Sequence, residues 1–256
     1  MDQLQRTDTE KTVLRWGGLA GLVGGVLFII VFGIVGVFVG EEPAGVEGAI
    51  ARFPDIKAAR TVENGLYLVV LALWAIHVVA VFRALRETSL APALVGCVLG
   101  LAGLAVLAAG ALPHAASVLI SDLYHAPGAT PTDQATLALV WHGTQGIFNA
   151  LLVTGLVILP MSVLAFGAAM LGNPAFGRRR GRATIALGVV GAVAAVALLV
   201  DPLSFIAVVG VFALIAFHLV VGWRMFRLAT EPANVWAATP ATEQVPRPTT
   251  RGVVSP

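Results

Sequence analysis

The feature that most constrains this chain is a set of six long apolar segments. They cover about residues 16–39, 65–82, 92–120, 136–171, 183–200 and 203–226. A hydrocarbon core of about 30 Å is crossed by roughly 20 apolar residues in a helix, and each segment approaches or exceeds that length. With 58% hydrophobic and only 12% charged residues, the chain is too apolar for one water-soluble core. The sequence therefore predicts an all-α fold, a polytopic transmembrane helix bundle with six spans.

The basic residues predict the orientation of this bundle. Of the 16 Lys and Arg residues, only three (Arg52, Lys57 and Arg60) lie on one side, in the connection after the first span; the other 13 lie in the tails and connections of the opposite side. Lys and Arg are enriched on the cytoplasmic side of membranes, so both termini are predicted to be cytoplasmic. Dividing the fourth segment at Pro160 would make seven spans and would place the arginines of 178–182 outside. Six spans therefore agree better with the charges.

Three regions follow from this topology. Residues 1–15 are predicted to form a cytoplasmic N-terminal tail, residues 16–228 the six-helix transmembrane domain, and residues 229–256 a disordered cytoplasmic tail rich in Pro and Thr. The basic cytoplasmic face is predicted to attract anionic lipids. Nucleic-acid binding is not predicted.

Small residues within the spans predict close helix packing. Gly17, Gly21 and Gly25 recur every four residues in the first span, and Gly96 and Gly100 do so in the third. This spacing lets membrane helices approach closely. Packing within the bundle is the preferred interpretation, and a homo-oligomer is the alternative. Cys97, the only cysteine, excludes an intramolecular disulfide and is expected to be a small packing residue of the third span.

The first outward connection, about residues 40–64, contains a short amphipathic pattern. Val46, Ile50 and Phe53 follow one another at helical spacing before Pro54. We expect this turn to lie on the membrane surface, as an interfacial cap in preference to a ligand lid.

Polar side chains at membrane depth are costly unless they are paired or face water, so they mark the candidate site. His142, Gln145 and Asn149 share one face of the fourth span, and this face is predicted to point into the bundle. Pro113 frees a backbone carbonyl and is expected to open the third helix locally. The predicted outward-opening ligand cavity consists of His142, Gln145, Asn149, His114, Asp201 and Glu63.

Alternative roles remain open for these polar groups. In the simplest, the side chains only fix helix packing by hydrogen bonds. In a second, the chain is a b-type cytochrome in which His77 with His218, and His114 with His142, bind haem for electron transfer. In a third, an outer-side metal site, structural or hydrolytic, uses His114 and His142 with His125, Asp122 or Asp201, although short metal-binding spacings such as H-x-x-x-H are absent.

Other chemistries find little support in the sequence. It contains no nucleotide-binding loop or nucleophile elbow, and no carboxylate at the middle of a span as a proton-coupled transporter would have. We therefore predict no catalytic residues and no cofactor, with haem b as the alternative.

Three stretches carry a resemblance to known sequences. They are Leu14-Arg15-Trp16-Gly17-Gly18-Leu19-Ala20-Gly21, Gly172-Asn173-Pro174-Ala175-Phe176-Gly177-Arg178 and Val221-Gly222-Trp223-Arg224. Across residues 14–228 the chain resembles uncharacterised bacterial multi-helix integral membrane families of the domain-of-unknown-function type. The resemblance implies a multi-pass protein of the bacterial cytoplasmic membrane, and it carries no active site. The resulting hypothesis is a non-enzymatic membrane protein that binds a small apolar or lipid-like ligand or supports a larger membrane assembly.

Overall fold

The structure, a computed structural model, describes residues 3–40, 43, 45–200 and 206–230. Its elements are α1 (Gln3–Ile34), the π-helical turn η1 (Val35–Val39), α2 (Val46–Leu85), α3 (Leu90–Ala109), α4 (Ala111–Tyr124), α5 (Pro131–Leu171), α6 (Gly177–Val200) and α7 (Ile206–Thr230). The described residues form no strand. Six helical stretches, with α3 and α4 counted as one, are long and apolar enough to cross a membrane. The all-helical prediction with six membrane-length segments is therefore confirmed.

Several helices extend beyond the predicted spans. α1 begins at Gln3, so most of the predicted N-terminal tail is helical. α5 continues through Pro160 as one helix of 41 residues, as the six-span prediction requires. α6 begins at Gly177, and the arginines of 178–182 therefore form its first turns. The predicted tail beyond residue 230 lies outside the described residues.

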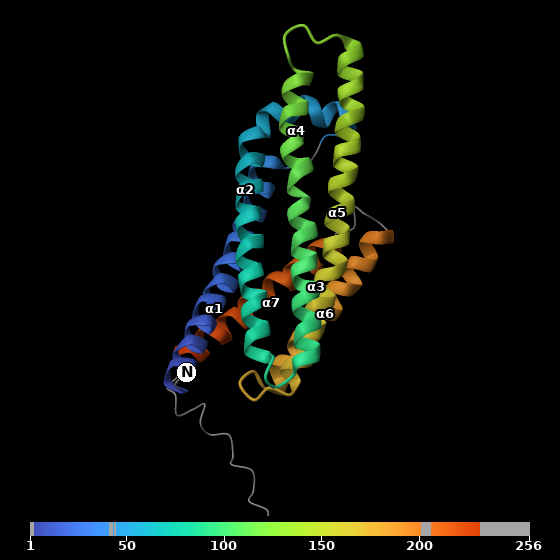
Figure 1. The fold of residues 1–256 in the computed structure, drawn as a ribbon. Helices are drawn as coiled ribbons and strands as arrows, with labels where there is room; N and C mark the ends of the chain where they lie inside the picture. Colours follow the sequence, from blue (N-terminus) through green and yellow to red (C-terminus); the bar gives the residue numbers. More distant parts are fainter. Residues whose placement is uncertain (1–2, 41–42, 44, 201–205, 231–256) are drawn as a thin grey trace, which may run out of the picture.

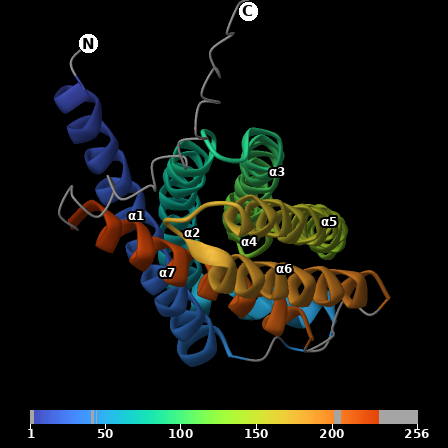
Figure 2. The same ribbon diagram turned by 90° about the horizontal axis from the view of Figure 1, so that it is seen from below.

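The helices form a closed ring in the order α1, α2, α3, α5, α6 and α7, with α7 packed against α1. Figure 2 views this ring from the end that carries the N-terminus. We call this end the basic end, because Arg83, Arg179 and Arg227 lie exposed there; the opposite end is the distal end. The main apolar core lies inside the ring, around Trp74 and Phe217.

Glycines allow the ring to close tightly. A Cβ atom on Gly21 of α1 would lie 2.5 Å from Nδ1 of His77 on α2 and 2.9 Å from the carbonyl oxygen of His218 on α7. On α3, a Cβ atom on Gly96 would lie 2.9 Å from the ring of Phe166 on α5. Both predicted glycine faces thus pack inside the bundle, and Cys97 beside Gly96 is buried as predicted.

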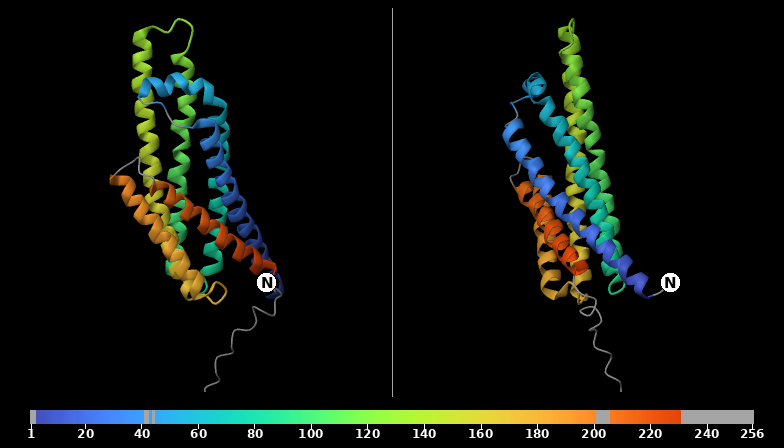
Figure 3. Two further views of the ribbon diagram at one scale, coloured as in Figure 1. Left: turned by 180° about the vertical axis from the view of Figure 1, so that it is seen from behind. Right: turned by 90° about the vertical axis from the view of Figure 1, so that its left-hand side faces the viewer.

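The distal end is uneven in height. α4 and the first half of α5 form a hairpin that extends well beyond the distal ends of α6 and α7 (Figure 3). α2 begins at Val46, inside the predicted connection, and its first turns lie across the bundle before the helix turns toward the basic end (Figure 1). This connection is thus largely helical, where we expected a loop with one amphipathic turn, and the position of that turn on the membrane surface stays a prediction. Ile50 and Phe53 are buried in a second apolar cluster with Ile120 and Trp141, because the α4–α5 hairpin offers them a protein surface.

The third predicted span is interrupted where Pro113 led us to expect an opening. α3 ends at Ala109 and α4 starts at Ala111, and Gly110 between them keeps right-handed helical angles (φ −62°, ψ −20°), so the break is slight. Because proline cannot donate a backbone hydrogen bond and crowds the preceding turn, the helix restarts here. His114 and Ser117 lie just beyond this break, on α4.

At the basic end, Asn173 joins two turns that are distant in sequence. Its side-chain amide donates to Oγ1 of Thr88 at 2.9 Å, in the α2–α3 turn, and its Oδ1 accepts from the backbone N–H of Ala175 at 2.9 Å. Arg224 of α7 donates two hydrogen bonds to the carbonyl oxygen of Ala175, at 2.9 and 2.7 Å. The α5–α6 turn is therefore held from two sides.

We expect Asn173→Ala to lower the free energy of unfolding by about 2 kcal/mol, because the change removes two hydrogen bonds of a buried side chain, each of which contributes about 1 kcal/mol. Thermal unfolding of the purified protein in detergent measures the effect. Asn149→Ala is the matched control, since Asn149 is exposed on α5 and its replacement should change the midpoint little. Equal midpoints for the two variants would show that the Asn173 contacts contribute nothing.

Candidate functional site

A polar cavity lies at the distal end, between the first part of α2, α4 and the first half of α5. Its space for the centres of water molecules is about 40 Å³, where one water needs roughly 10–15 Å³ on the same measure. The lining residues are Pro43, Ala49, Arg52, Phe53, Ile56, Arg60, His114, Ser117, Trp141 and Gln145. The cavity thus combines cationic and hydrogen-bonding groups with aromatic and aliphatic walls.

The first segment of α2 supplies the cationic wall. Arg52 donates from Nη2 to the carbonyl oxygen of Val39, at the end of η1, over 2.6 Å. Arg60 lies two turns later on the same helix and forms an ion pair with Glu63 at 3.0 Å. Between them Phe53 packs its ring edge-on against Trp141 of α5, with centroids 5.1 Å apart. This aromatic contact fixes the segment against the hairpin.

All three basic residues of the predicted outer side have structural roles. Arg52 and Arg60 line the cavity, and Lys57 forms an ion pair with Asp122 of α4, at 2.7 Å. In the sequence, these three residues contributed only to the predicted orientation. Their helical spacing together with Phe53 and Ile56 was the signal that could have identified them as a lining face.

The hairpin supplies the neutral polar wall. The side-chain amide of Gln145 on α5 donates to Oγ of Ser117 on α4 at 3.0 Å, and Ser117 donates to the carbonyl oxygen of Pro113 at 3.0 Å. His114 is half-buried, and its ring lies edge-on to Phe148 with centroids 5.3 Å apart. Two of the predicted cavity residues, His114 and Gln145, therefore do meet at one cavity.

The other residues of the predicted polar face lie elsewhere. His142 and Asn149 are exposed, so the expectation that the whole stripe points inward is wrong. The inward face of α5 is centred on Trp141 and Phe148. Successive residues are rotated by about 100° around a helix of 3.6 residues per turn, so His142 and Asn149 each turn away from this face. Gln145 lies at its edge and reaches the cavity.

Two further predicted cavity residues are acidic. Glu63 reaches the cavity only through its ion pair with Arg60. Asp201 lies outside the described residues.

A second polar cluster is buried within the ring, between α2 and α7 and beneath α1. The rings of His77 and His218 have centroids 5.0 Å apart, and Trp74 stacks on His218 at 4.0 Å with an interplanar angle of 8°. His77 is 0% and His218 3% exposed. Nδ1 of His77 lies 2.8 Å from the carbonyl oxygen of Gly17, which can only accept, so this nitrogen carries the proton. The two histidines, paired from the sequence as alternative haem ligands, are thus neighbours.

This cluster, as packed, does not fit a haem. The rings of Trp74, His77, Phe217 and His218 contact one another directly, and the glycine face of α1 closes the remaining side. A porphyrin would need the space between and around the two imidazoles. The other suggested pair has no shared buried site either, because His114 packs on Phe148 whereas His142 is exposed.

The suggested metal ligands are engaged in separate interactions. His125 donates from Nδ1 to the carbonyl oxygen of Ser121 at 2.8 Å, and Asp122 pairs with Lys57. Within the described ranges, no three His, Cys, Asp or Glu side chains are gathered closely enough to hold a metal ion. The described residues therefore give no support to a metal site at the cavity.

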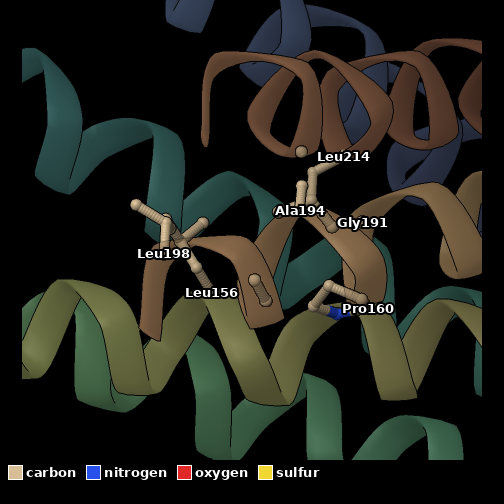
Figure 4. Close-up of a pocket in the computed structure, with 8 residues that line it drawn as sticks. Leu156, Pro160, Gly191, Ala194, Leu198 and Leu214 are labelled. Carbon is tan, nitrogen blue, oxygen red and sulfur yellow. The ribbon is translucent and has the colours of Figure 1, made fainter. Parts of the chain in front are cut away.

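A third gap, between α5, α6 and α7, is apolar. Figure 4 shows Leu156 and Pro160 of α5 facing Gly191, Ala194 and Leu198 of α6 and Leu214 of α7. The gap leaves no room for the centre of a water molecule. With no polar side chain in its lining, this seam serves packing, and the distal cavity is the better candidate site.

Comparison with protein families, with curated proteins and with solved structures finds no match to this chain. The function must therefore be argued from the geometry of the chain itself.

Proposed function

We propose that this integral membrane protein is non-enzymatic and uses its distal cavity to bind the polar end of a small lipid-like molecule. The observation that carries the proposal is the convergence of Arg52, Arg60, His114 and Gln145 on one cavity whose remaining walls, apart from Ser117, are apolar. Guanidinium groups present up to five N–H donors and match the oxygens of phosphates and carboxylates. Phe53, Ile56 and Trp141 offer apolar surface to the adjoining chain of such a ligand.

The position of the cavity relative to a bilayer supports a ligand that comes from the membrane. α3 has 20 residues and is therefore about 30 Å long, the thickness of a hydrocarbon core. Its distal end at Gly110 lies level with Phe148 and Leu151 of α5. The cavity begins one turn further out, at His114. A bilayer matched to α3 therefore brings its head groups to the cavity.

The same comparison of helix lengths places the α4–α5 hairpin outside the hydrocarbon core. α5 has 41 residues, about 60 Å of helix, which is roughly twice the hydrocarbon thickness. Its first half, with His142 and Asn149, then stands beyond the hydrocarbon core, at the level of the head groups and of the water outside them. Their exposure costs little there, because water solvates both side chains.

The excess of Lys and Arg supports a cytoplasmic basic end and an extracytoplasmic distal end. We propose that the protein lies in a bacterial cytoplasmic membrane with both termini inside. Arg83, Arg178, Arg179 and Arg227 are exposed at the basic end and attract anionic lipid of the inner leaflet. The distal cavity would bind a lipid of the outer leaflet.

Binding of phosphatidylglycerol to the purified protein, measured by native mass spectrometry, tests the cavity. We expect Gln145→Leu and Arg52→Gln each to weaken one lipid-binding event about tenfold or more, since a hydrogen bond to a charged group contributes about 1.5–3 kcal/mol. Soluble glycerol 1-phosphate, added as a competitor, shows whether the head group alone binds.

Two variants control for chemistry and charge. Asn149→Leu makes the same kind of change as Gln145→Leu on an exposed position of the same helix. Lys57→Gln removes one positive charge near the cavity without changing its lining. Both should bind phosphatidylglycerol as the unmodified protein does. If all four folded variants bind equally well, the lipid is held elsewhere and the proposal is wrong.

A further inference from the structure

The buried polar atoms that lack a partner are concentrated in one place. Among the described residues, three buried side-chain nitrogens have no hydrogen-bond partner in the protein: Nε1 of Trp74, Nε2 of His77 and Nδ1 of His218. All three belong to the cluster between α2 and α7, where Trp74 and His77 each lie against His218. Buried polar groups are nearly always hydrogen-bonded, so each exception requires an explanation. Here the three exceptions share one location.

The chemistry of the three nitrogens defines what can satisfy them. The indole Nε1–H of Trp74 only donates and requires an acceptor. Because Nδ1–H of His77 donates to Gly17, Nε2 of the neutral ring is an acceptor and requires a donor. Nδ1 of His218 takes either role, depending on its tautomer. The shared partner must therefore both accept and donate hydrogen bonds.

A cation meets these requirements poorly. It could bind the imidazole lone pairs, but it cannot accept from the indole N–H of Trp74. A buried charge also needs a counter-charge, and no acidic or thiolate group joins His77 and His218 in a metal-binding set within the described part of the chain. The partner is accordingly small and neutral.

We propose that Trp74, His77 and His218 form a binding site for one water molecule in the interior of the membrane domain. The water accepts a hydrogen bond from Nε1–H of Trp74 and donates one to Nε2 of His77. Its second O–H group or second lone pair forms a hydrogen bond with Nδ1 of His218. α1 closes the side of the site at Trp74, because a Cβ atom on Gly24 would lie 2.9 Å from Nε1 of Trp74. The site therefore lies next to bare helix backbone.

The Gly17 contact determines what this water does. A neutral imidazole passes a proton only when both of its nitrogens can exchange roles, and Nδ1 of His77 is committed to the Gly17 carbonyl oxygen. The water is consequently a fixed hydrogen-bonding link between α2 and α7 and does not form a proton relay. This inference is independent of the distal cavity.

Solid-state NMR of the full chain in phosphatidylcholine bilayers, with ¹⁵N-labelled His and Trp, tests the site. Magnetisation transferred from water should reach the Trp74 indole N–H and the ring nitrogens of His77 and His218. Trp74→Phe keeps a stacked ring but removes the donor, and it should reduce transfer to the two imidazoles at least two-fold. Trp223→Phe is the control, because Trp223 is exposed at the basic end and should not affect them.

Three results would overturn the proposal, and each can be measured on the unmodified protein without any variant. The first is no transfer to the cluster while the exposed Trp223 indole receives it, which would show a dry site. The second is a direct coupling between the ring nitrogens of His77 and His218, which would show that they bond to each other. The third is one equivalent of metal per chain, or haem absorption bands, in the purified protein.

Discussion

Replacing Gly21 by alanine is expected to lower the free energy of unfolding by about 2 kcal/mol or more, and replacement by leucine is expected to prevent folding. A Cβ atom there would lie 2.5 Å from Nδ1 of His77 and 2.9 Å from the backbone carbonyl oxygen of His218. Overpacking of a close-packed interior typically costs about 1–3 kcal/mol. At this position α1 must also move, because one of the obstructing atoms is backbone.

Thermal unfolding in detergent, followed by size-exclusion chromatography of the surviving protein, measures this effect. Gly33→Ala is the matched control, because Gly33 lies on the same helix with nothing within 4 Å of its added Cβ atom. Alanine is the better helix former by up to about 1 kcal/mol, so this variant should be unchanged or more stable. A Gly21→Ala protein as stable as Gly33→Ala would refute the close approach of α1.

A single cysteine at residue 139 is expected to react completely with a membrane-impermeant maleimide added to intact cells, whereas one at residue 179 should react only after the cells are opened. Leu139 is 74% exposed on the distal half of α5, and Arg179 is exposed at the basic end. The native Cys97 is 8% exposed in α3 and is first replaced by serine. This labelling tests the proposed orientation directly.

Val193→Cys provides the internal control. Val193 is 61% exposed on α6, but it faces the proposed hydrocarbon layer, where a thiol does not ionise to the reactive thiolate. It should therefore stay unlabelled even in opened cells. Labelling at 179 but not at 139 in intact cells would reverse the topology. Labelling at 193 would show that this face of α6 is in contact with water.

Some residues of the two polar sites, the distal cavity and the buried histidine cluster, could be selected from the sequence. His77 and His218 were paired from the sequence as alternative haem ligands, and they are in contact. Gln145 and His114 were also selected correctly as neighbours of one cavity. The inward face of α5 was misjudged by about 100°, because the polar stripe was assumed to seek the interior. In a helix half that extends past its neighbours, the bulky Trp141 is buried instead.

Sequence alone determined the six apolar helices and the glycine faces, because hydrophobic length and small-residue spacing are local properties of the chain. Tertiary structure decided which polar groups meet. Arg52 and Arg60 joined the cavity because the first turns of α2 fold across the α4–α5 hairpin, and Asn173 became a link between two turns because the helices return to one end. Contacts of this kind depend on how the helices pack around one another. Thr88 and Asn173 are 85 positions apart, and no local sequence pattern indicates that two such residues will be in contact.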